Sequence, residues 1–128
     1  MSPVHWLKGG TVRSIILALL FAVGCGAAAS AQTVGGKYSI KGTNPDGSSY
    51  GGTAEITPSG DSCRMVWHTD STWRGICMLA NKSFAASYRL GDTYGLVIYE
   101  LQPDGILKGV WTVADQNGAG TETLIPAK

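Results

Sequence analysis

Apolar and polar residues alternate along most of the chain after residue 36, in short runs rich in Tyr, Trp, Val, Ile and Thr. Gly, Pro, Asn or Asp interrupts these runs roughly every ten to thirteen residues. Alternation with a period of two is typical of a strand with one buried face, and no window shows a helical period. The pattern predicts eight strands: Lys37–Thr43, Tyr50–Thr57, Ser62–His68, Thr72–Leu79, Ser83–Tyr88, Tyr94–Leu101, Ile106–Val113 and Gly120–Pro126.

The connectors between these strands are short, and the one after the fifth strand is RLGDT. Short connectors join antiparallel neighbours, so the simplest topology is a meander. Pairing the first strand with the last would remove both exposed edges. We therefore expect an all-β fold, a single small eight-stranded antiparallel up-and-down β-barrel over residues 32–128.

Two connectors, residues 44–47 and 102–105, contain the same Pro-Asp-Gly sequence. Proline presets the backbone of a turn, and glycine adopts the left-handed conformation that closes a three-residue hairpin loop. This geometry sets the register of the flanking strands. It places two pairs of opposite charges directly across from each other, a favourable arrangement. These pairs are Lys37 with Glu55 and Glu100 with Lys108.

Five aromatic residues are predicted to point into the barrel: Tyr38, Trp67, Trp73, Tyr99 and Trp111. The interior of an eight-stranded barrel is just wide enough to be filled by side chains or to hold one small ligand. Because five large rings take up much of that volume, we expect a filled core. The alternative is a ligand cup that opens near Trp67 and Trp73, with Trp111 and Tyr99 as further ligand-binding residues.

Residues 63–77, CRMVWHTDSTWRGIC, contain two cysteines and a histidine. With residues 69–71 as the loop of a hairpin, Cys63 lies opposite Cys77. Opposed residues on antiparallel strands have Cα atoms about 4.5 to 5.5 Å apart, which a disulfide can bridge. The segment therefore predicts a hairpin closed by a disulfide, with free or redox-active thiols as the alternative.

The same hairpin does not support a reaction centre or a metal site. Successive side chains of a strand point to opposite faces, so His68 points away from both cysteines. A Cys–His nucleophile pair needs the two side chains within hydrogen-bonding reach, and a zinc site needs converging ligands. We expect no catalytic residue, no metal and no cofactor.

The outer face of this hairpin carries Arg64, Arg74 and His68 beside apolar side chains. One interpretation is an ordinary solvated exterior, on which single apolar residues are common. The other is a partner-binding patch, because arginine beside exposed apolar residues is typical of interfaces. Leu96 and Ile98 are also predicted to face outward, which extends the patch.

The N-terminus has the pattern of a secretory signal peptide. Lys8 and Arg13 accompany a short apolar stretch, residues 15–23, and the sequence Ala-Ser-Ala precedes Gln32 as a cleavage pattern. The apolar stretch is shorter than the about 20 residues that a membrane span needs. We expect residues 1–31 to be removed.

Cys25 gives a second hypothesis for the N-terminus, in which this cysteine carries a lipid and the protein is an outer-envelope lipoprotein. Only then would the protein contact a membrane. Otherwise we expect a secreted or periplasmic protein, in a compartment where paired cysteines are oxidised.

The charge of the mature chain argues against nucleic-acid binding. Lys8 and Arg13 leave with the signal, so eight of the ten basic residues remain against nine acidic ones, and no basic run is present. No pair of carboxylates is predicted to converge in a cleft, as acid–base hydrolysis would need, and no glycine-rich phosphate loop occurs.

Three segments, residues 42–57, 97–105 and 120–124, resemble a group of small exported bacterial β-barrel proteins that often carry the label "fibronectin-binding protein". The likeness covers nearly the whole mature chain and rests on turn and strand residues. Cys63 and Cys77 are not part of the pattern of that group.

This resemblance implies an exported, non-enzymatic protein that engages a protein partner, such as a host or extracellular-matrix protein, through its barrel surface. Arg64, Arg74 and His68 are the expected contact residues. Barrel architecture suggests two alternatives, a carrier of a small apolar ligand of the avidin or lipocalin type and a secreted hydrolase inhibitor. Such analogies rest on fold alone.

Overall fold

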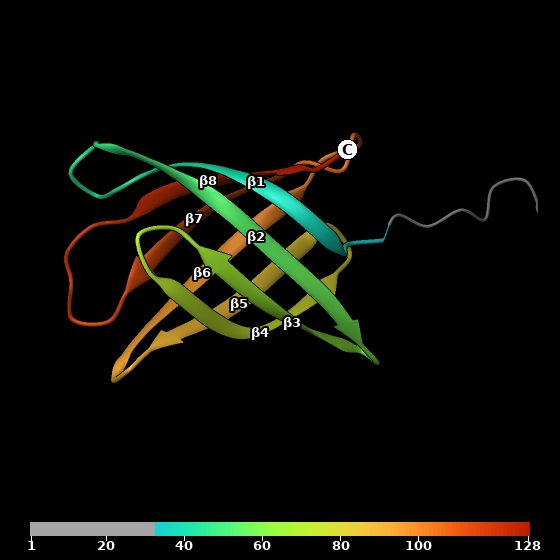
Figure 1. The fold of residues 1–128 in the computed structure, drawn as a ribbon, viewed down its shortest axis with the longest axis horizontal. Coiled ribbons are helices and arrows are strands. Elements are labelled where there is room, and N and C mark those ends of the chain that lie inside the picture. Colours follow the sequence, from blue (N-terminus) through green and yellow to red (C-terminus); the bar gives the residue numbers. More distant parts are fainter. Residues whose placement is uncertain (1–32) are drawn as a thin grey trace, which may run out of the picture. The chain divides into compact units, whose positions relative to one another are not determined.

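A computed structural model describes residues 33–128, which form one closed barrel of antiparallel strands (Figure 1). The predicted fold class is confirmed. The strands are β1 (Gly36–Thr43), β2 (Ser49–Ser59), β3 (Ser62–His68), β4 (Thr72–Ala80), β5 (Ser83–Leu90), β6 (Thr93–Leu101), β7 (Leu107–Val113) and β8 (Gly120–Pro126). The expected signal peptide, its cleavage site and Cys25 lie outside the described residues.

The barrel closes because β1 pairs with both β2 and β8. Each remaining strand pairs with its neighbours in sequence, so the chain is a simple meander. Closure gives every strand two partners and leaves no open sheet edge. Within residues 33–128, no helix has the length and hydropathy of a membrane span.

The predicted registers are confirmed. Lys37 lies opposite Glu55, and Glu100 lies opposite Lys108. In the second of these hairpins, the Gln102 amide donates to the Ile106 carbonyl over 2.8 Å, as a three-residue loop requires. The turn residues therefore determine which side chains share a face.

Several strand boundaries differ from the prediction, and most strands are longer. The connector after the fifth strand is shorter than expected, because β5 continues to Leu90 and β6 already begins at Thr93. Gly91 has φ +59°, the left-handed conformation that lets the chain turn within two residues. β7 begins at Leu107 and not at Ile106. Ile106 lies in the connector, where its amide donates to Asp104 Oδ1 over 3.1 Å.

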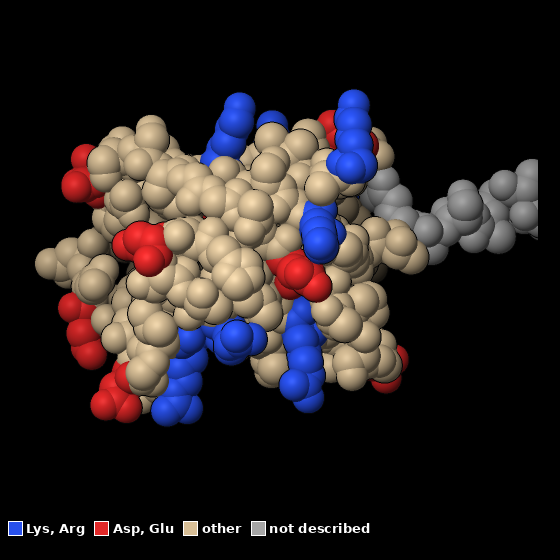
Figure 2. Space-filling model, in the orientation of Figure 1, with Lys and Arg blue, Asp and Glu red and all other residues tan. Residues whose placement is uncertain are grey.

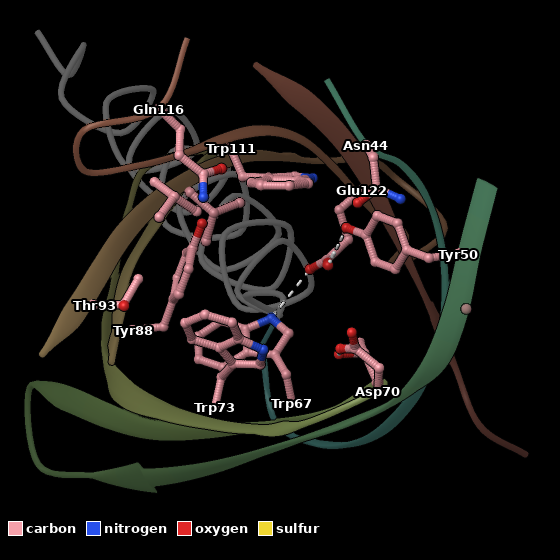
Figure 3. Close-up of a pocket in the computed structure, with 14 residues that line it drawn as sticks. Asn44, Tyr50, Trp67, Asp70, Trp73, Tyr88, Thr93, Trp111, Gln116 and Glu122 are labelled. Carbon is pink, nitrogen blue, oxygen red and sulfur yellow. Dashed lines mark hydrogen bonds between the residues drawn. The ribbon is translucent and has the colours of Figure 1, made fainter. Parts of the chain in front are cut away.

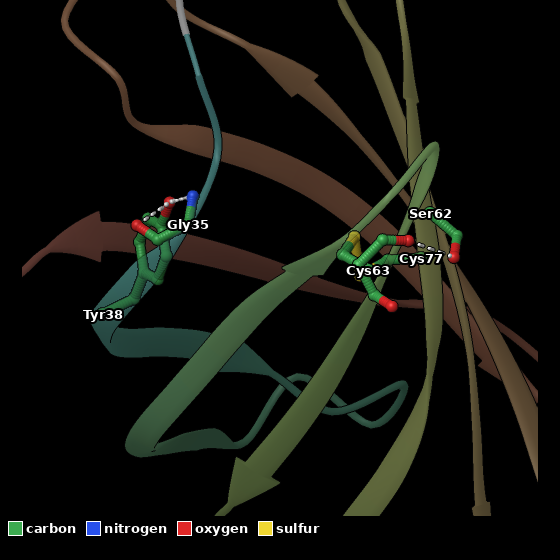
Figure 4. The surroundings of a disulfide bond; sticks show 6 residues. Gly35, Tyr38, Ser62, Cys63 and Cys77 are labelled. Atoms are coloured by element: carbon green, nitrogen blue, oxygen red, sulfur yellow. Dashed lines mark hydrogen bonds between the residues drawn. A yellow bond between two sulfur atoms is a disulfide. The ribbon is translucent and has the colours of Figure 1, made fainter.

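Apolar side chains fill one half of the barrel, the half that lies away from the β5–β6 turn at Gly91. The most deeply buried side chains there and in the middle of the barrel are Ile56, Met65, Phe84, Val97, Tyr99, Leu107 and Leu124. At its end, the hydroxyl of Tyr38 accepts from the Gly35 amide over 3.0 Å and donates to the Gly35 carbonyl over 3.2 Å (Figure 4). The expectation of a filled core is correct for this half.

The predicted disulfide joins Cys63 and Cys77 at the filled end, where both residues are buried (Figure 4). Their Cα atoms are 4.9 Å apart, and they are directly opposed partners of β3 and β4. The bond ties two neighbouring strands beside the β2–β3 connector. Because these cysteines point inward and His68 is exposed, the histidine lies on the opposite face of β3.

Candidate functional site

The other half of the barrel is hollow. A cavity of about 480 Å³ lies inside it, within the size range of small-molecule pockets (Figure 3). Its mouth is surrounded by four connectors, residues 44–48, 69–71, 91–92 and 114–119, each of which joins an odd-numbered strand to the next even-numbered one. The expectation of a filled core is therefore wrong for this half.

The cavity exists because the rings of this half pack along the wall and not across the barrel axis. Trp73 and Tyr88 meet edge to face with centroids 5.4 Å apart, and Trp67 also packs edge to face with Tyr88, at 5.4 Å. On the opposite wall, Tyr50 and Trp111 form a third edge-to-face pair at 6.0 Å. Such pairs are favourable, and they leave the centre open.

Backbone acceptors hold the polar atoms of two rings. The Tyr88 hydroxyl donates to the Thr112 carbonyl over 2.7 Å, and the Trp111 indole N–H donates to the Thr121 carbonyl over 3.1 Å. The Trp111 ring lies against Gly120, where a Cβ atom would overlap the indole. Figure 3 shows the rings of Tyr88 and Trp111 edge-on, with their faces turned toward the cavity.

Glu122 is the one charged side chain among the buried residues of the described chain, with 6% of its surface exposed, and it lines the cavity. Three donors reach its carboxylate. Tyr50 Oη donates to Oε1 over 2.7 Å, Trp67 Nε1 donates to Oε2 over 3.1 Å, and Tyr99 Oη donates to Oε2. Donors from three strands therefore fix this carboxylate in one position. Figure 3 shows Tyr50 and Trp67 directed toward it.

No basic side chain of residues 33–128 forms an ion pair with Glu122; its contacts are the three neutral donors. A charge removed from water costs free energy unless it is hydrogen-bonded and paired. The hydrogen bonds to the tyrosines and the tryptophan offset part of this cost. They leave the charge itself without a counter-ion.

The carboxylate affects the tyrosines around it. Burial raises the pKa of the Tyr50 hydroxyl, and the negative charge of Glu122 raises it further. Burial and then the same charge also raise the pKa of Tyr88 and, well above its usual value, that of Tyr99. All three phenols are therefore held as neutral donors, and the field of Glu122 extends across the cavity to Tyr88.

The mouth is polar, in contrast to the aromatic walls. The polar lining residues nearest the connectors are Asn44, Thr69, Asp70, Thr93 and Gln116. Asp70 and Glu122 are the acidic residues among those that line the cavity. Across residues 33–128, no group of three or more His, Cys, Asp or Glu side chains is arranged to hold a metal.

Three of the four residues of the ligand-cup alternative, Trp67, Trp73 and Trp111, line this cavity. Tyr99 does not: only 1% of its surface is exposed, and its hydroxyl reaches Glu122 from within the packed core. It therefore orients the carboxylate and does not face the open space.

Sequence reasoning missed Glu122, together with Tyr50 and Tyr88 on the walls. One signal was present: Gly120, Glu122 and Leu124 alternate along β8, and the inward position of Leu124 places Glu122 on the inner face. A charged residue on an otherwise apolar inner face marks a special site.

The expected partner-binding residues lie elsewhere. Arg64, Arg74 and His68 are exposed on the outer face of β3 and β4, where Arg64 lies opposite Ile76 and His68 opposite Thr72. The His68 ring nitrogen Nδ1 is 3.3 Å from the Thr72 hydroxyl. None of the three lines the cavity, so their role remains a prediction.

Comparison with known proteins adds a likeness of fold. No protein-family profile matches the sequence, and a search of curated proteins finds no match. Among solved structures, a redesigned β-barrel, mFAP1, bound to DFHBI, is similar with a TM-score of 0.62 and 20% sequence identity. The match covers 72% of this chain and 94% of that one. At this identity the likeness concerns the fold alone.

Proposed function

We propose that this protein binds a small organic molecule in the cavity at the open end of its barrel, and that it is a binding protein and not an enzyme. The observation that carries the proposal is an open cavity of about 480 Å³ with a buried, hydrogen-bonded carboxylate in its wall. Small-molecule sites combine apolar and aromatic walls with a few fixed polar groups, and this cavity has both. The similar redesigned barrel was solved bound to DFHBI, which is compatible with such a use of the fold.

The arrangement of the site favours binding over catalysis. Glu122 accepts hydrogen bonds from three groups that hold it in place, and the phenols around it have raised pKa values because of burial and its charge. Phenols with raised pKa values suit recognition as neutral donors better than proton transfer, which needs a pKa near the working pH. The disulfide is compatible with an extracellular or periplasmic location, where such a carrier would meet ligands from the medium.

A pair of variants on one strand tests the proposal. Val113 lines the cavity and Val110 lies on the outer face with 57% of its surface exposed, and both belong to β7. Val113→Trp should fill the cavity, whereas Val110→Trp adds the same ring outside. The neutral fluorescent probe N-phenylnaphthylamine is titrated into each protein and into the wild type.

Saturable binding to the wild type and to Val110→Trp, with at least tenfold weaker binding to Val113→Trp, is the expected result. Equal binding to all three would mean that the probe sits elsewhere, and the proposal would be wrong. Circular dichroism and urea unfolding of both variants verify that each retains the barrel.

A second candidate function, contact with a protein partner, is favoured by one observation on the outer surface. Four neighbouring apolar side chains of β4, β6 and β7 are strongly exposed: Ile76, Met78, Ile98 and Val110. In register, Met78 pairs with Ala85, Ala85 with Ile98 and Ile98 with Val110, so these residues form a continuous row across β4 to β7. Ile76 lies two residues from Met78 on the same face of β4. Contiguous apolar surface of this kind marks interaction sites.

The expected contact residues Arg64 and Arg74 border Ile76, because Arg64 lies opposite it on β3 and Arg74 precedes it by two residues on β4. The double variant Arg64→Ala/Arg74→Ala should lose a partner captured from envelope or host extracts, while its affinity for the probe in the cavity stays unchanged. An unaltered capture profile would remove these residues from the second candidate.

A further inference from the structure

We propose that the ligand of the cavity is an organic cation, an amine or quaternary ammonium group carried on an aromatic or branched apolar body. This inference rests on the proposed function and specifies the class of ligand. Three observations carry it: the unpaired buried carboxylate, the ring faces that surround the space beside it, and the charge of the mouth.

The first observation is the state of Glu122. Its three partners are neutral donors, and no lysine or arginine of residues 33–128 pairs with it. The basic residues of the barrel are all exposed, on its outer face or at its ends. A cationic ligand would supply the counter-ion that the protein lacks. In a site shielded from water, such a charge pair is stronger than on the surface.

The second observation is the aromatic lining. The faces of Tyr88 and Trp111 turn toward the cavity, and their hydroxyl and N–H groups are engaged by backbone carbonyls (Figure 3). The rings therefore present their negative π faces and not their polar atoms. Cations within about 6 Å of such faces are attracted, and cages of several rings bind quaternary ammonium groups.

The third observation is the charge around the opening. Each of the four connectors at the mouth contains one aspartate, and none contains lysine or arginine: Asp46, Asp70, Asp92 and Asp115. Figure 2 shows acidic side chains gathered at this end of the barrel. Arg89 is the nearest strand arginine, and its Nε is held outside by the Gly91 carbonyl over 2.8 Å. A negative mouth attracts cations and repels anions.

An anionic ligand fits the same cavity poorly. It would meet Glu122 without a neutralising group, and the phenols nearby are neutral because burial and that charge raise their pKa values. A neutral ligand would gain from the aromatic walls but would leave the carboxylate unpaired. The cavity thus distinguishes ligands of equal shape by their charge.

A pair of probes with the same shape tests this. Phenyltrimethylammonium and tert-butylbenzene differ in one central atom, nitrogen or carbon, and therefore in charge. Each is titrated against wild-type protein loaded with N-phenylnaphthylamine, and displacement of the probe gives the affinity. We expect the cation to bind at least tenfold more tightly than the neutral isostere. Benzenesulfonate should not displace the probe.

Two variants locate the source of the preference. Glu122→Gln should reduce the ratio of the two affinities to threefold or less, and Asp70→Asn should reduce it by a smaller factor. If Glu122→Gln does not fold, the two affinities measured on the wild type and on Asp70→Asn still decide whether the cavity prefers the cation. Val110→Trp, on the outer face, should keep the full ratio.

The outcomes separate this inference from the function on which it rests. Probe binding with equal affinities for cation and neutral isostere would overturn the cation proposal and leave a binding cavity. A ratio that stays above tenfold in folded Glu122→Gln would also overturn the assignment of Glu122 as the recognising group. Absence of probe binding to the wild type would overturn both.

Discussion

Removal of the Tyr99 hydroxyl tests how much the buried hydrogen bonds to Glu122 contribute to the stability of the barrel. In Tyr99→Phe, Glu122 Oε2 loses one of its two donors, and Trp67 Nε1 loses a partner at 3.2 Å. The site is buried, with 1% of Tyr99 exposed, so water cannot easily replace the hydroxyl. Loss of a hydrogen bond to a charged group costs about 1.5–3 kcal/mol. We expect the free energy of unfolding to fall by about 2 kcal/mol.

Two matched variants calibrate this value. Tyr50→Phe removes the donor to Oε1, but Tyr50 is half-buried beside the open cavity, so water can take its place and the loss should be about 1 kcal/mol. Tyr94→Phe removes an exposed hydroxyl, and its effect should stay within about 0.5 kcal/mol.

Urea unfolding of the oxidised proteins, followed by circular dichroism, measures all three. For a domain of this size, about 2 kcal/mol corresponds to a decrease in Tm of about 8–16 °C. In the Glu122→Gln background the same Tyr99→Phe change should cost about 1 kcal/mol less, because the acceptor is then uncharged. If Tyr99→Phe were as mild as Tyr94→Phe, the argument that this bond stabilises a buried charge would be refuted.

Three further predictions concern Gly120 beside the Trp111 ring, the disulfide, and the tyrosines around Glu122. Gly120→Ala should lower the free energy of unfolding by about 2 kcal/mol, because its Cβ would overlap the Trp111 ring; urea unfolding measures this, and a neutral effect would contradict it. Replacing Cys63 and Cys77 by alanine should cost about 3 kcal/mol, and a reductant should have this effect only on the wild type. Tyr50, Tyr88 and Tyr99 have raised pKa values in the folded protein. Their contribution to stability is therefore complete below about pH 10, the usual tyrosine pKa, and is lost as the pH rises further. The ultraviolet signal of tyrosine ionisation should appear together with unfolding and not before it.

Much of the fold could be predicted because its determinants are local. The Pro-Asp-Gly turns set the register of two hairpins, and from that register the alternation decides which residues point inward. The opposition of Cys63 and Cys77 followed from the same reasoning, and the structure confirms it. Closure between β1 and β8 was predicted from the need to remove exposed edges.

The cavity could not be predicted in the same way. The alternation of apolar and polar residues predicts that Trp67, Trp73 and Trp111 point inward. It does not predict whether their rings cross the barrel axis or lie along the wall. That choice depends on contacts between side chains of different strands, such as those of Tyr88 on β5 with Trp67 on β3 and Trp73 on β4. Side-chain volume alone therefore suggested a filled core.

Glu122 was missed for a related reason. Its partners Tyr50, Trp67 and Tyr99 come from β2, β3 and β6, which are far apart in the sequence. Only closure of the barrel brings these donors together. A charged residue at an inward position of β8 is visible in the sequence, but the donors that stabilise it become apparent only in three dimensions.

The most direct test of the central claim is an NMR titration of the protein with phenyltrimethylammonium, followed through the indole N–H signals of the barrel. Trp67, Trp73 and Trp111 all line the cavity, so we expect their three indole signals to shift together and to saturate at one affinity. The backbone amides of Ile98 and Val110, whose side chains point outward, should shift little. Saturating shifts confined to those outer residues, with unchanged indole signals, would contradict the account.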